Sequence, residues 1–259
     1  MSRTEPDLSA FSLAGKRILV TGANTGIGQG IAISVARAGG SVIGVGRSAM
    51  DETAERIAAA GGRFAAVRFD LSDTASAGAM LDRVWDESGP LDGLVNNAGI
   101  IRRADAVELT EVDWDDVMDV NLKAVFLLSQ RFARRVLAEP GRRGKIVNIA
   151  SVLSFQGGIR VASYTASKHG VLGVTRLLAC EWAQKGINVN AIAPGYIETN
   201  NTEALRADPD RSASILARIP AGRWGGPEDI GDAAVFLLAP ASNYMHGAVV
   251  PVDGGWLAR

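Results

Sequence analysis

Tyr164 and Lys168 are the first residues whose types and spacing suggest chemistry, because they lie four positions apart in a segment of helical periodicity. On a helix, this spacing places the ammonium group of Lys168 beside the phenol of Tyr164. A free phenol, with a pKa of about 10, is a poor proton acceptor at neutral pH. A cation about 4 Å away, at an effective dielectric constant of about 20, favours the phenolate by ~4 kcal/mol, or about 3 pKa units. Tyr164 is therefore predicted to titrate at a pH of about 7 and to accept a proton from a hydroxyl group.

Ser151 lies thirteen residues before Tyr164, directly after the apolar run 145–149. Its hydroxyl can donate a hydrogen bond to a substrate oxygen on which negative charge develops. The Tyr-x-x-x-Lys pattern alone occurs by chance on many surface helices. Its combination with Ser151 and with a glycine-rich turn near the N-terminus favours a catalytic site.

That glycine-rich turn follows the first apolar run, 17–20, and precedes a helical pattern. Gly22, Gly26 and Gly28 stand where the chain must bend tightly and where backbone must approach a ligand closely. The N-terminus of the following helix offers free N–H groups and the positive end of the helix dipole, both of which favour a pyrophosphate. Because the chain contains 30 glycines, three spaced glycines would be a weak signal by themselves. The strand before them and the helix after them favour a dinucleotide-binding turn.

The spacing of this turn resembles that of the short-chain dehydrogenase/reductase family, and further motifs agree with the resemblance from residue 13 onward. Asp70-Leu71 follows the third predicted strand, Asn96-Asn97-Ala98-Gly99 the fourth, and Pro194-Gly195-Tyr196-Ile197-Glu198-Thr199 the sixth. The resemblance implies hydride transfer between a nicotinamide ring and a secondary alcohol or its ketone. It implies a catalytic tetrad of Asn121, Ser151, Tyr164 and Lys168, in which Asn121 holds a water molecule on the proton path from Lys168.

The resemblance and the glycine turn together predict the residues that bind the cofactor. Asp70 is expected to contact the adenine amino group, and Ile197 and Thr199 the nicotinamide carboxamide. The full predicted set is Gly22, Asn24, Thr25, Gly26, Ile27, Gly28, Arg47, Asp70, Leu71, Asn97, Ala98, Gly99, Tyr164, Lys168, Pro194, Gly195, Ile197 and Thr199.

The end of the second predicted strand distinguishes NAD from NADP. An NAD enzyme usually places a carboxylate there, which accepts a hydrogen bond from the ribose 2′-hydroxyl. Here Gly46 has no side chain, and Arg47 could pair with a 2′-phosphate. The sequence therefore favours NADP over NAD, with a solvent-facing Arg47 as the alternative.

Within the family, the segments 100–103, 153–160, 195–224 and 252–259 are similar to those of sugar-acid dehydrogenases. A carboxylate flanked by hydroxyls calls for a guanidinium group with amide and hydroxyl partners. The candidates are Arg102, Arg160 and Arg206 for the carboxylate, and Gln156 and Asn201 for the hydroxyls, although each arginine could equally be a surface residue. Two other functions stay open: a 3-oxoacyl-[acyl-carrier-protein] reductase, and a regulatory protein that binds a dinucleotide without turnover.

The elements that must position these residues follow from the alternation of short apolar runs with helical patterns. The predicted strands are 17–20, 41–45, 64–68, 93–95, 145–149, 188–192 and 248–252, and the predicted helices are 28–38, 51–60, 74–87, 112–137, 163–184 and 227–238. This alternation is typical of an α/β protein: one Rossmann-type domain with a doubly wound parallel sheet of about seven strands, flanked by helices. Residues 1–12 are predicted to be an N-terminal tail and 13–259 the catalytic domain, with a substrate lid, or else a surface helix, at 195–224.

Composition excludes several function classes. The net charge of −1, without a lysine or arginine block, argues against nucleic acid, and no apolar run is long enough to span a membrane. One cysteine and two histidines argue against a disulfide or a metal site, and Cys180 is expected to be a buried thiol. The first residues lack the profile of a secretory signal, so a cytoplasmic location is expected. The family resemblance implies a homotetramer, and Trp256 and Leu257 are expected to pack at a subunit contact or on their own subunit.

Overall fold

The computed structural model describes residues 7–259, so half of the predicted tail, residues 1–6, lies outside the described residues. Seven parallel strands form one sheet in the order β3-β2-β1-β4-β5-β6-β7. They are β1 Arg17–Thr21, β2 Ser41–Gly46, β3 Arg63–Arg68, β4 Gly93–Asn96, β5 Gly144–Ile149, β6 Ile187–Pro194 and β7 Val249–Val252. The predicted fold class, a doubly wound parallel sheet flanked by helices, is confirmed.

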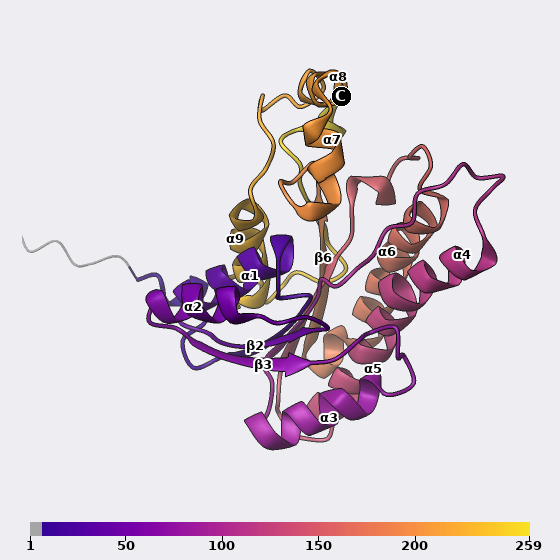
Figure 1. Cartoon of the computed structure of the whole chain (residues 1–259). Coiled ribbons are helices and arrows are strands. Elements are labelled where there is room, and N and C mark those ends of the chain that lie inside the picture. The colour runs from indigo at the N-terminus through magenta and orange to yellow at the C-terminus, as the bar shows by residue number, and fades with distance from the viewer. Residues whose placement is uncertain (1–6) are drawn as a thin grey trace, which may run out of the picture.

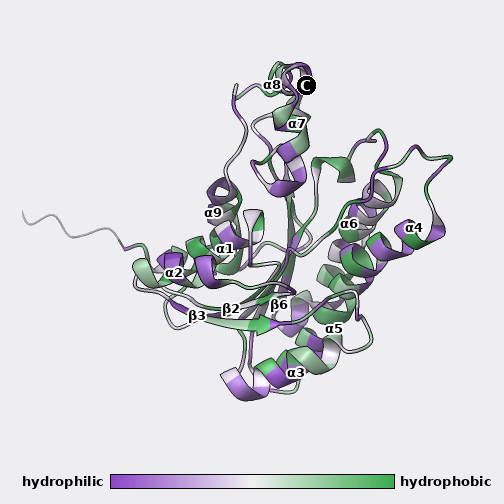
Figure 2. Ribbon diagram, in the orientation of Figure 1, coloured by the Kyte–Doolittle hydropathy of each residue, from purple (hydrophilic) through white to green (hydrophobic). Residues whose placement is uncertain are grey.

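The apolar runs became strands because the interior of the sheet is covered on both faces. Every residue of β6 is buried, and the register aligns Leu19 of β1 with Ile43 of β2 and Leu94 of β4. β3, at one edge, is largely exposed and carries arginine at both ends. Hydrophobic residues concentrate in the strands and on the helix faces turned toward them (Figure 2).

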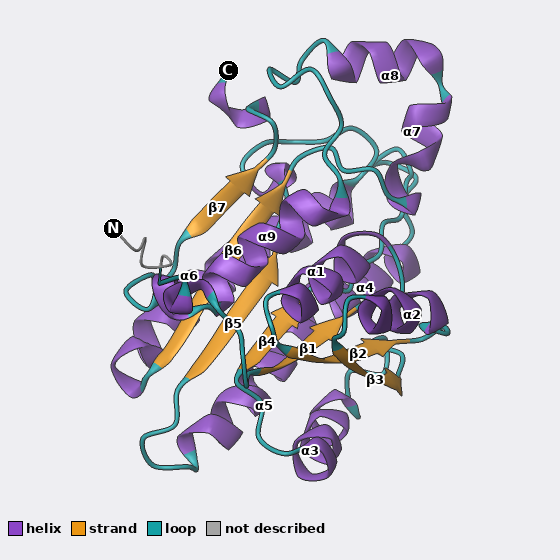
Figure 3. Ribbon diagram, turned by 90° about the vertical axis from the view of Figure 1, so that its left-hand side faces the viewer, coloured by secondary structure: helices purple, strands orange, loops and turns teal. Residues whose placement is uncertain are grey.

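Two helical layers enclose the sheet (Figures 1 and 3). One hydrophobic core joins the sheet to α1 Gly26–Arg37, α2 Asp51–Ala59 and α9 Pro227–Leu238. The second core joins it to α3 Ala77–Ser88, α5 Ala124–Leu137 and α6 Ala162–Trp182. α4 Glu111–Met118 precedes α5 and packs against α6. The short helices α7 Glu203–Ala207 and α8 Pro209–Leu216 stand above the carboxyl end of β6 (Figure 1).

Two sequence expectations differ from the structure. The predicted helix 112–137 is interrupted by a π-helical turn at Asp119–Lys123, which separates α4 from α5. One extra residue in a helical turn leaves the apolar pattern on both sides intact, so periodicity did not reveal it. Cys180 is exposed on α6, and the expectation of a buried thiol is wrong. The apolar stretch around it is wider than the stripe that α6 buries.

The strand order reverses direction between β1 and β4. In doubly wound sheets, ligands bind outside the carboxyl ends of the strands at such a switch point. The loops after β1, β4, β5 and β6 carry the glycine turn, Asn97, Ser151 and Thr199. The topology therefore brings the predicted site residues to one edge of the sheet.

Candidate active site

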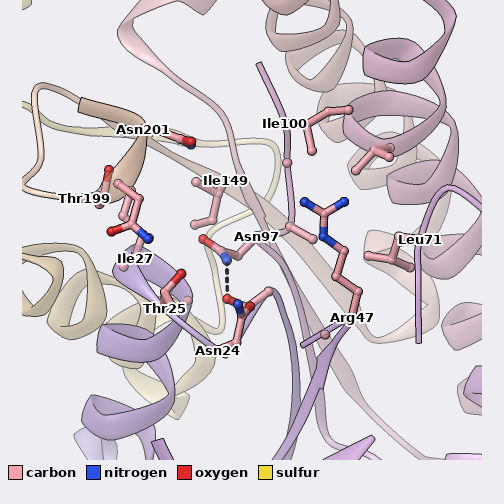
Figure 4. Close-up of a pocket in the computed structure, with 18 of the residues that line it drawn as sticks. Asn24, Thr25, Ile27, Arg47, Leu71, Asn97, Ile100, Ile149, Thr199 and Asn201 are labelled. Atoms are coloured by element: carbon pink, nitrogen blue, oxygen red, sulfur yellow. Dashed lines mark hydrogen bonds between the residues drawn. The ribbon is translucent and has the colours of Figure 1, made fainter. Parts of the chain in front are cut away.

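A cavity of about 780 Å³ opens at this edge of the sheet. All eighteen residues predicted to bind the cofactor line it, together with Ser151. The Figure 4 close-up looks into this cavity, with Asn24, Thr25 and Ile27 on one side and Leu71 and Ile100 on the other. Among the residues described, no cluster of His, Cys, Asp or Glu could hold a metal ion, and no helix is long and apolar enough to cross a membrane.

The glycine turn between β1 and α1 forms a cradle of bare backbone. Gly22 has a φ of 69°, a conformation that favours glycine, and a Cβ on Gly28 would lie 2.1 Å from the carbonyl oxygen of Gly22. The side chain of Asn97 donates a 2.8 Å hydrogen bond to the backbone oxygen of Thr21 and so braces the turn from the neighbouring strand. Close-packed backbone at the N-terminus of a twelve-residue helix fits the pyrophosphate of a dinucleotide.

Thr21 is a site residue that sequence reasoning missed. Its hydroxyl accepts hydrogen bonds from the backbone N–H groups of Asn97 and Ala98, each at 3.0 Å. It thereby ties the loop after β4 to the end of β1. The signal was the position of a hydroxyl residue at the last place of the first strand, next to Gly22.

Where the cavity meets the carboxyl end of β2, that strand end presents the cation Arg47 and no carboxylate. The side chain of Arg47 extends into the cavity between Asn97 and Leu71 (Figure 4). The side-chain amide of Asn24 donates a 2.9 Å hydrogen bond to the hydroxyl of Ser48, and both residues line the cavity. The pKa of Asp70 is lowered, first by the hydrogen bond from the backbone N–H of Ser72 and more weakly by the charge of Arg47. Asp70 is therefore a carboxylate at neutral pH.

Tyr164 and Lys168 lie one turn apart on α6, both in the cavity wall. The ammonium nitrogen of Lys168 is 5.6 Å from the centre of the Tyr164 ring and donates a 2.6 Å hydrogen bond to the backbone oxygen of Ile149. Burial lowers the pKa of Lys168 to about 8. The two side chains share one face of the helix, as the spacing predicts.

The sequence predicts a lowered pKa for Tyr164, and for the protein without a bound cofactor this prediction is wrong. Burial raises the pKa of Tyr164 above its ordinary value, while the hydroxyl of Ser151 and the charge of Arg103 act in the opposite direction. A nearby ammonium group lowers the pKa of a phenol that water still reaches, but a phenolate enclosed by protein loses its hydration, which raises the pKa. The ammonium group of Lys168 is also engaged with the carbonyl of Ile149.

Asn121 is fully buried in the π-helical turn and does not line the cavity. Its side-chain oxygen accepts a 2.8 Å hydrogen bond from the N–H of Ile100, and its amide nitrogen donates to the carbonyl of Ile100 at 2.9 Å. The amide thus holds the loop after β4 against α4 and α5. Its predicted role in holding a water molecule stays a prediction.

The predicted substrate residues separate into two groups. Arg102 and Asn201 line the cavity, whereas Gln156, Arg160 and Arg206 do not. Arg160, in a left-handed conformation, pairs with Asp105 at 3.2 Å, and Arg206 donates to the backbone oxygen of Thr199. Arg160 and Arg206 are thus engaged by neighbouring residues, and the substrate roles expected of Gln156, Arg160 and Arg206 stay predictions.

Arg103 is a candidate substrate-binding residue that was not identified from the sequence, which indicated the neighbouring Arg102 instead. Arg102 pairs with Asp113 at 3.2 Å and with Asp116 at 3.0 Å, so its charge is largely neutralised. Within the described residues no carboxylate pairs with Arg103; its guanidinium donates a 3.1 Å hydrogen bond to the backbone oxygen of Asn201, and its charge lowers the pKa of Tyr164. The doublet of arginines after β4 was visible, but which of the two faces the phenol depends on the acidic partners on α4.

Comparison with known proteins agrees with this arrangement. The family model described as Enoyl-(Acyl carrier protein) reductase matches residues 22–257. The chain belongs to this family of short-chain dehydrogenases/reductases and is an oxidoreductase, as the sequence predicts.

Individual relatives within the family are closely similar along the whole chain. The 2-dehydro-3-deoxy-D-gluconate 5-dehydrogenase of Escherichia coli (strain K12) is 58% identical over 252 residues, which are 97% of this chain and 99% of the relative. The gluconate 5-dehydrogenase of Gluconobacter oxydans is 42% identical over 254 residues, covering 97% and 98%. A crystal structure from Agrobacterium tumefaciens with bound NADP, provisionally named 2-deoxy-D-gluconate 3-dehydrogenase, has a TM-score of 0.92 and 63% identity and covers 96% of this chain and 99% of its own.

Proposed function

We propose that this enzyme transfers hydride between a nicotinamide cofactor and a secondary hydroxyl or keto group of a sugar acid, in the manner of 2-dehydro-3-deoxy-D-gluconate 5-dehydrogenase. The observation that carries the proposal is that Ser151 and Tyr164 line the cavity while Arg103, which pairs with no carboxylate among the described residues, acts on Tyr164 through its charge. Arg103 is also bonded to the backbone of Asn201 in the cavity wall. A neutral alcohol would not require that cation. The names and full-length identities of the relatives support the same substrate class.

In the oxidative direction, the residues of this chain handle the proton and the substrate oxygen. Tyr164 as phenolate accepts the proton of the substrate hydroxyl, and Ser151 donates a hydrogen bond to the same oxygen as the carbonyl forms. A nicotinamide held beside Ile197 and Thr199 would supply the hydride acceptor in this direction, and the positive charge of its oxidised form would favour the phenolate. In the reductive direction, Tyr164 returns the proton to the oxygen.

Arg103 is proposed to hold the carboxylate of the sugar acid. Guanidinium groups bind carboxylates through two parallel hydrogen bonds. The hydrogen bond of Arg103 to the carbonyl of Asn201 leaves donors of the guanidinium group free. The same contact reaches the segment 195–224, which is proposed to be a lid that closes over the substrate.

NADP is proposed as the preferred cofactor. Gly46 presents no carboxylate that would repel a 2′-phosphate, and Arg47 and Ser48 offer donors to it. Several similar crystal structures contain bound NADP. The predicted cytoplasmic location and the homotetramer stay predictions.

Initial rates with NADP and NAD against 2-dehydro-3-deoxygluconate, gluconate and 2-deoxygluconate would test this function. We expect turnover of at least one sugar acid, a loss of at least 10³-fold in kcat for Tyr164→Phe, and an increase of about tenfold or more in KM for Arg103→Leu. Arg102→Leu is the matched control: its charge is already paired, so a smaller change in KM is expected.

Three outcomes would contradict the proposal or redirect it. Turnover of a 3-oxoacyl thioester without turnover of sugar acids would favour the acyl reductase. Cofactor binding without turnover of any substrate would favour the regulatory protein. An unchanged KM for the sugar acid in Arg103→Leu would show that another group holds the carboxylate.

A further inference from the structure

Ser154 is a buried serine three residues after Ser151, outside the cavity wall and outside the predicted tetrad. Its hydroxyl accepts a 3.2 Å hydrogen bond from the backbone N–H of Ser151 and donates a 2.7 Å hydrogen bond to the backbone oxygen of Lys168. One side chain therefore connects the turn that carries Ser151 to the helix that carries Tyr164 and Lys168.

The turn around Ser151 is closed by reciprocal hydrogen bonds. The backbone N–H of Ser154 donates to the carbonyl of Ser151 at 2.9 Å, while the hydroxyl of Ser151 accepts from the N–H of Leu153 at 3.1 Å. Ser151 itself is extended, with φ of −166° and ψ of 161°. This backbone conformation aims its hydroxyl, and it depends on where the N–H of Ser151 is held.

Lys168 is held at both of its ends by the same stretch of chain. Its ammonium group donates to the carbonyl of Ile149, at the end of β5, and its backbone oxygen accepts from Ser154. The carbonyl of a residue inside an α-helix already has a helical donor, so the bond from Ser154 is not required to form α6. Its effect is to fix the distance between α6 and the turn after β5.

We propose that Ser154 is a positioning residue that sets the place of the Ser151 hydroxyl relative to the phenol of Tyr164. The inference rests on the proposed function, in which both groups meet the substrate oxygen. Burial raises the pKa of Tyr164, and the hydroxyl of Ser151 and the guanidinium of Arg103 lower it. The ammonium of Lys168 also lies near the ring, 5.6 Å from its centre. Ser154 acts on the position of the Ser151 hydroxyl, because it accepts a hydrogen bond from the backbone N–H of Ser151.

Replacement of Ser154 by alanine removes the hydroxyl and leaves the N–H of Ser151 without its acceptor. We expect kcat in Ser154→Ala to fall about tenfold, with an unchanged Kd for the cofactor. The hydroxyl of Ser151 lowers the pKa of Tyr164, so a displaced Ser151 should move the acidic limb of the oxidation profile to higher pH. Ser154→Cys keeps the size and a weak donor, and should recover part of the loss.

A double-mutant cycle separates positioning from general destabilisation. If Ser154 acts through Ser151, then Ser154→Ala should change kcat by less than about twofold in a Ser151→Ala background. Ser242→Ala is the matched control, because Ser242 is also buried, donates to a helix carbonyl and accepts from a side chain, Lys145, at the opposite end of the sheet. It should leave kcat and the pH profile unchanged.

Three results would overturn the inference: an unchanged kcat in Ser154→Ala, a full tenfold loss that persists in the Ser151→Ala background, or a loss without any shift of the acidic limb. A failure of the proposed function would be seen separately, as wild-type enzyme that turns over no sugar acid. In that case tyrosinate difference spectra of the NADP-bound protein, with Tyr164→Phe as reference, give the pKa of Tyr164 without turnover. A pKa that Ser154→Ala leaves unchanged would then overturn it, and a raised pKa would support it.

Discussion

At the scale of single residues, the site places ionisable groups where burial works against their charges. Tyr164 and Lys168 are both pushed toward their neutral forms, with the pKa of Tyr164 raised and that of Lys168 lowered to about 8. Such opposed shifts, in one cavity, are typical of residues that exchange protons rather than of residues that stabilise a fold. Burial of these two ionisable groups therefore lowers the free energy of unfolding, while it places their protons where a substrate can exchange them.

Lys168→Met should make the protein more stable and inactive. The unfolded chain binds a proton at Lys168 up to a pH of about 10.5, and the folded chain only up to about 8, so wild-type stability rises between these pH values. A shift from 10.5 to about 8 corresponds to roughly 3 kcal/mol, reduced in the variant by the lost hydrogen bond to Ile149. Urea unfolding at pH 7 should show a gain of about 2 kcal/mol for the variant, and the gain should shrink by pH 10. A variant less stable than wild type at pH 7 would show that the hydrogen bond outweighs burial.

At the scale of elements, the ends of parallel strands determine which groups meet. The end of β2 brings Gly46 and Arg47 beside the glycine turn after β1, because the two strands are paired in parallel register. The π-helical turn likewise positions Asn121, whose buried side chain is hydrogen-bonded to the backbone of Ile100. The end of strand β2 positions Gly46 and Arg47, and the wider π-helical turn positions Asn121.

Arg47→Ala should weaken NADP selectively. With its guanidinium gone, KM for NADP is expected to rise about tenfold or more, while KM for NAD changes by less than about threefold. Arg63→Ala is the matched control, because Arg63 is an exposed arginine at the amino end of β3, where it donates to the hydroxyl of Ser41 and does not line the cavity. Steady-state kinetics with both cofactors measure the ratio. An unchanged preference for NADP in Arg47→Ala would refute the phosphate contact.

At the scale of the whole molecule, some apolar side chains remain uncovered. Val112 and Trp114 on α4 and Leu177 on α6 are 70%, 38% and 51% exposed. Trp256, in contrast, is buried within its own chain, with its ring centre 4.7 Å from that of Tyr196. Trp256 therefore packs on its own chain, against Tyr196 at the start of the segment 195–224.

The predicted homotetramer would cover the apolar residues on α4 and α6. Light scattering coupled to size exclusion should give a mass about four times the chain mass of 27.1 kDa. Trp114→Lys combined with Leu177→Glu should reduce that mass. Leu8→Glu, at a similarly exposed apolar residue on the N-terminal segment, should not. A monomeric wild-type protein would contradict the prediction.

The sequence by itself determined the alternating elements, the parallel sheet, the glycine turn and the shared face of Tyr164 and Lys168. These features depend on local rules: the two-residue period of strands, the 3.6-residue period of helices, and the freedom of Gly22 to take a positive φ. Those rules are readable from neighbouring residues alone.

Only the tertiary structure decided which arginine faces the phenol, in which direction the pKa of Tyr164 moves, and that Ser154 connects two distant segments. Asp113 and Asp116 on α4 neutralise the charge of Arg102. Burial raises the pKa of Tyr164. The hydroxyl of Ser154 donates a hydrogen bond to the backbone oxygen of Lys168, fourteen residues away. Each outcome is set by partners that are remote in sequence and come together only when the chain is packed. Desolvation and long-range pairing are properties of the packed chain, and no local pattern of residues encodes them.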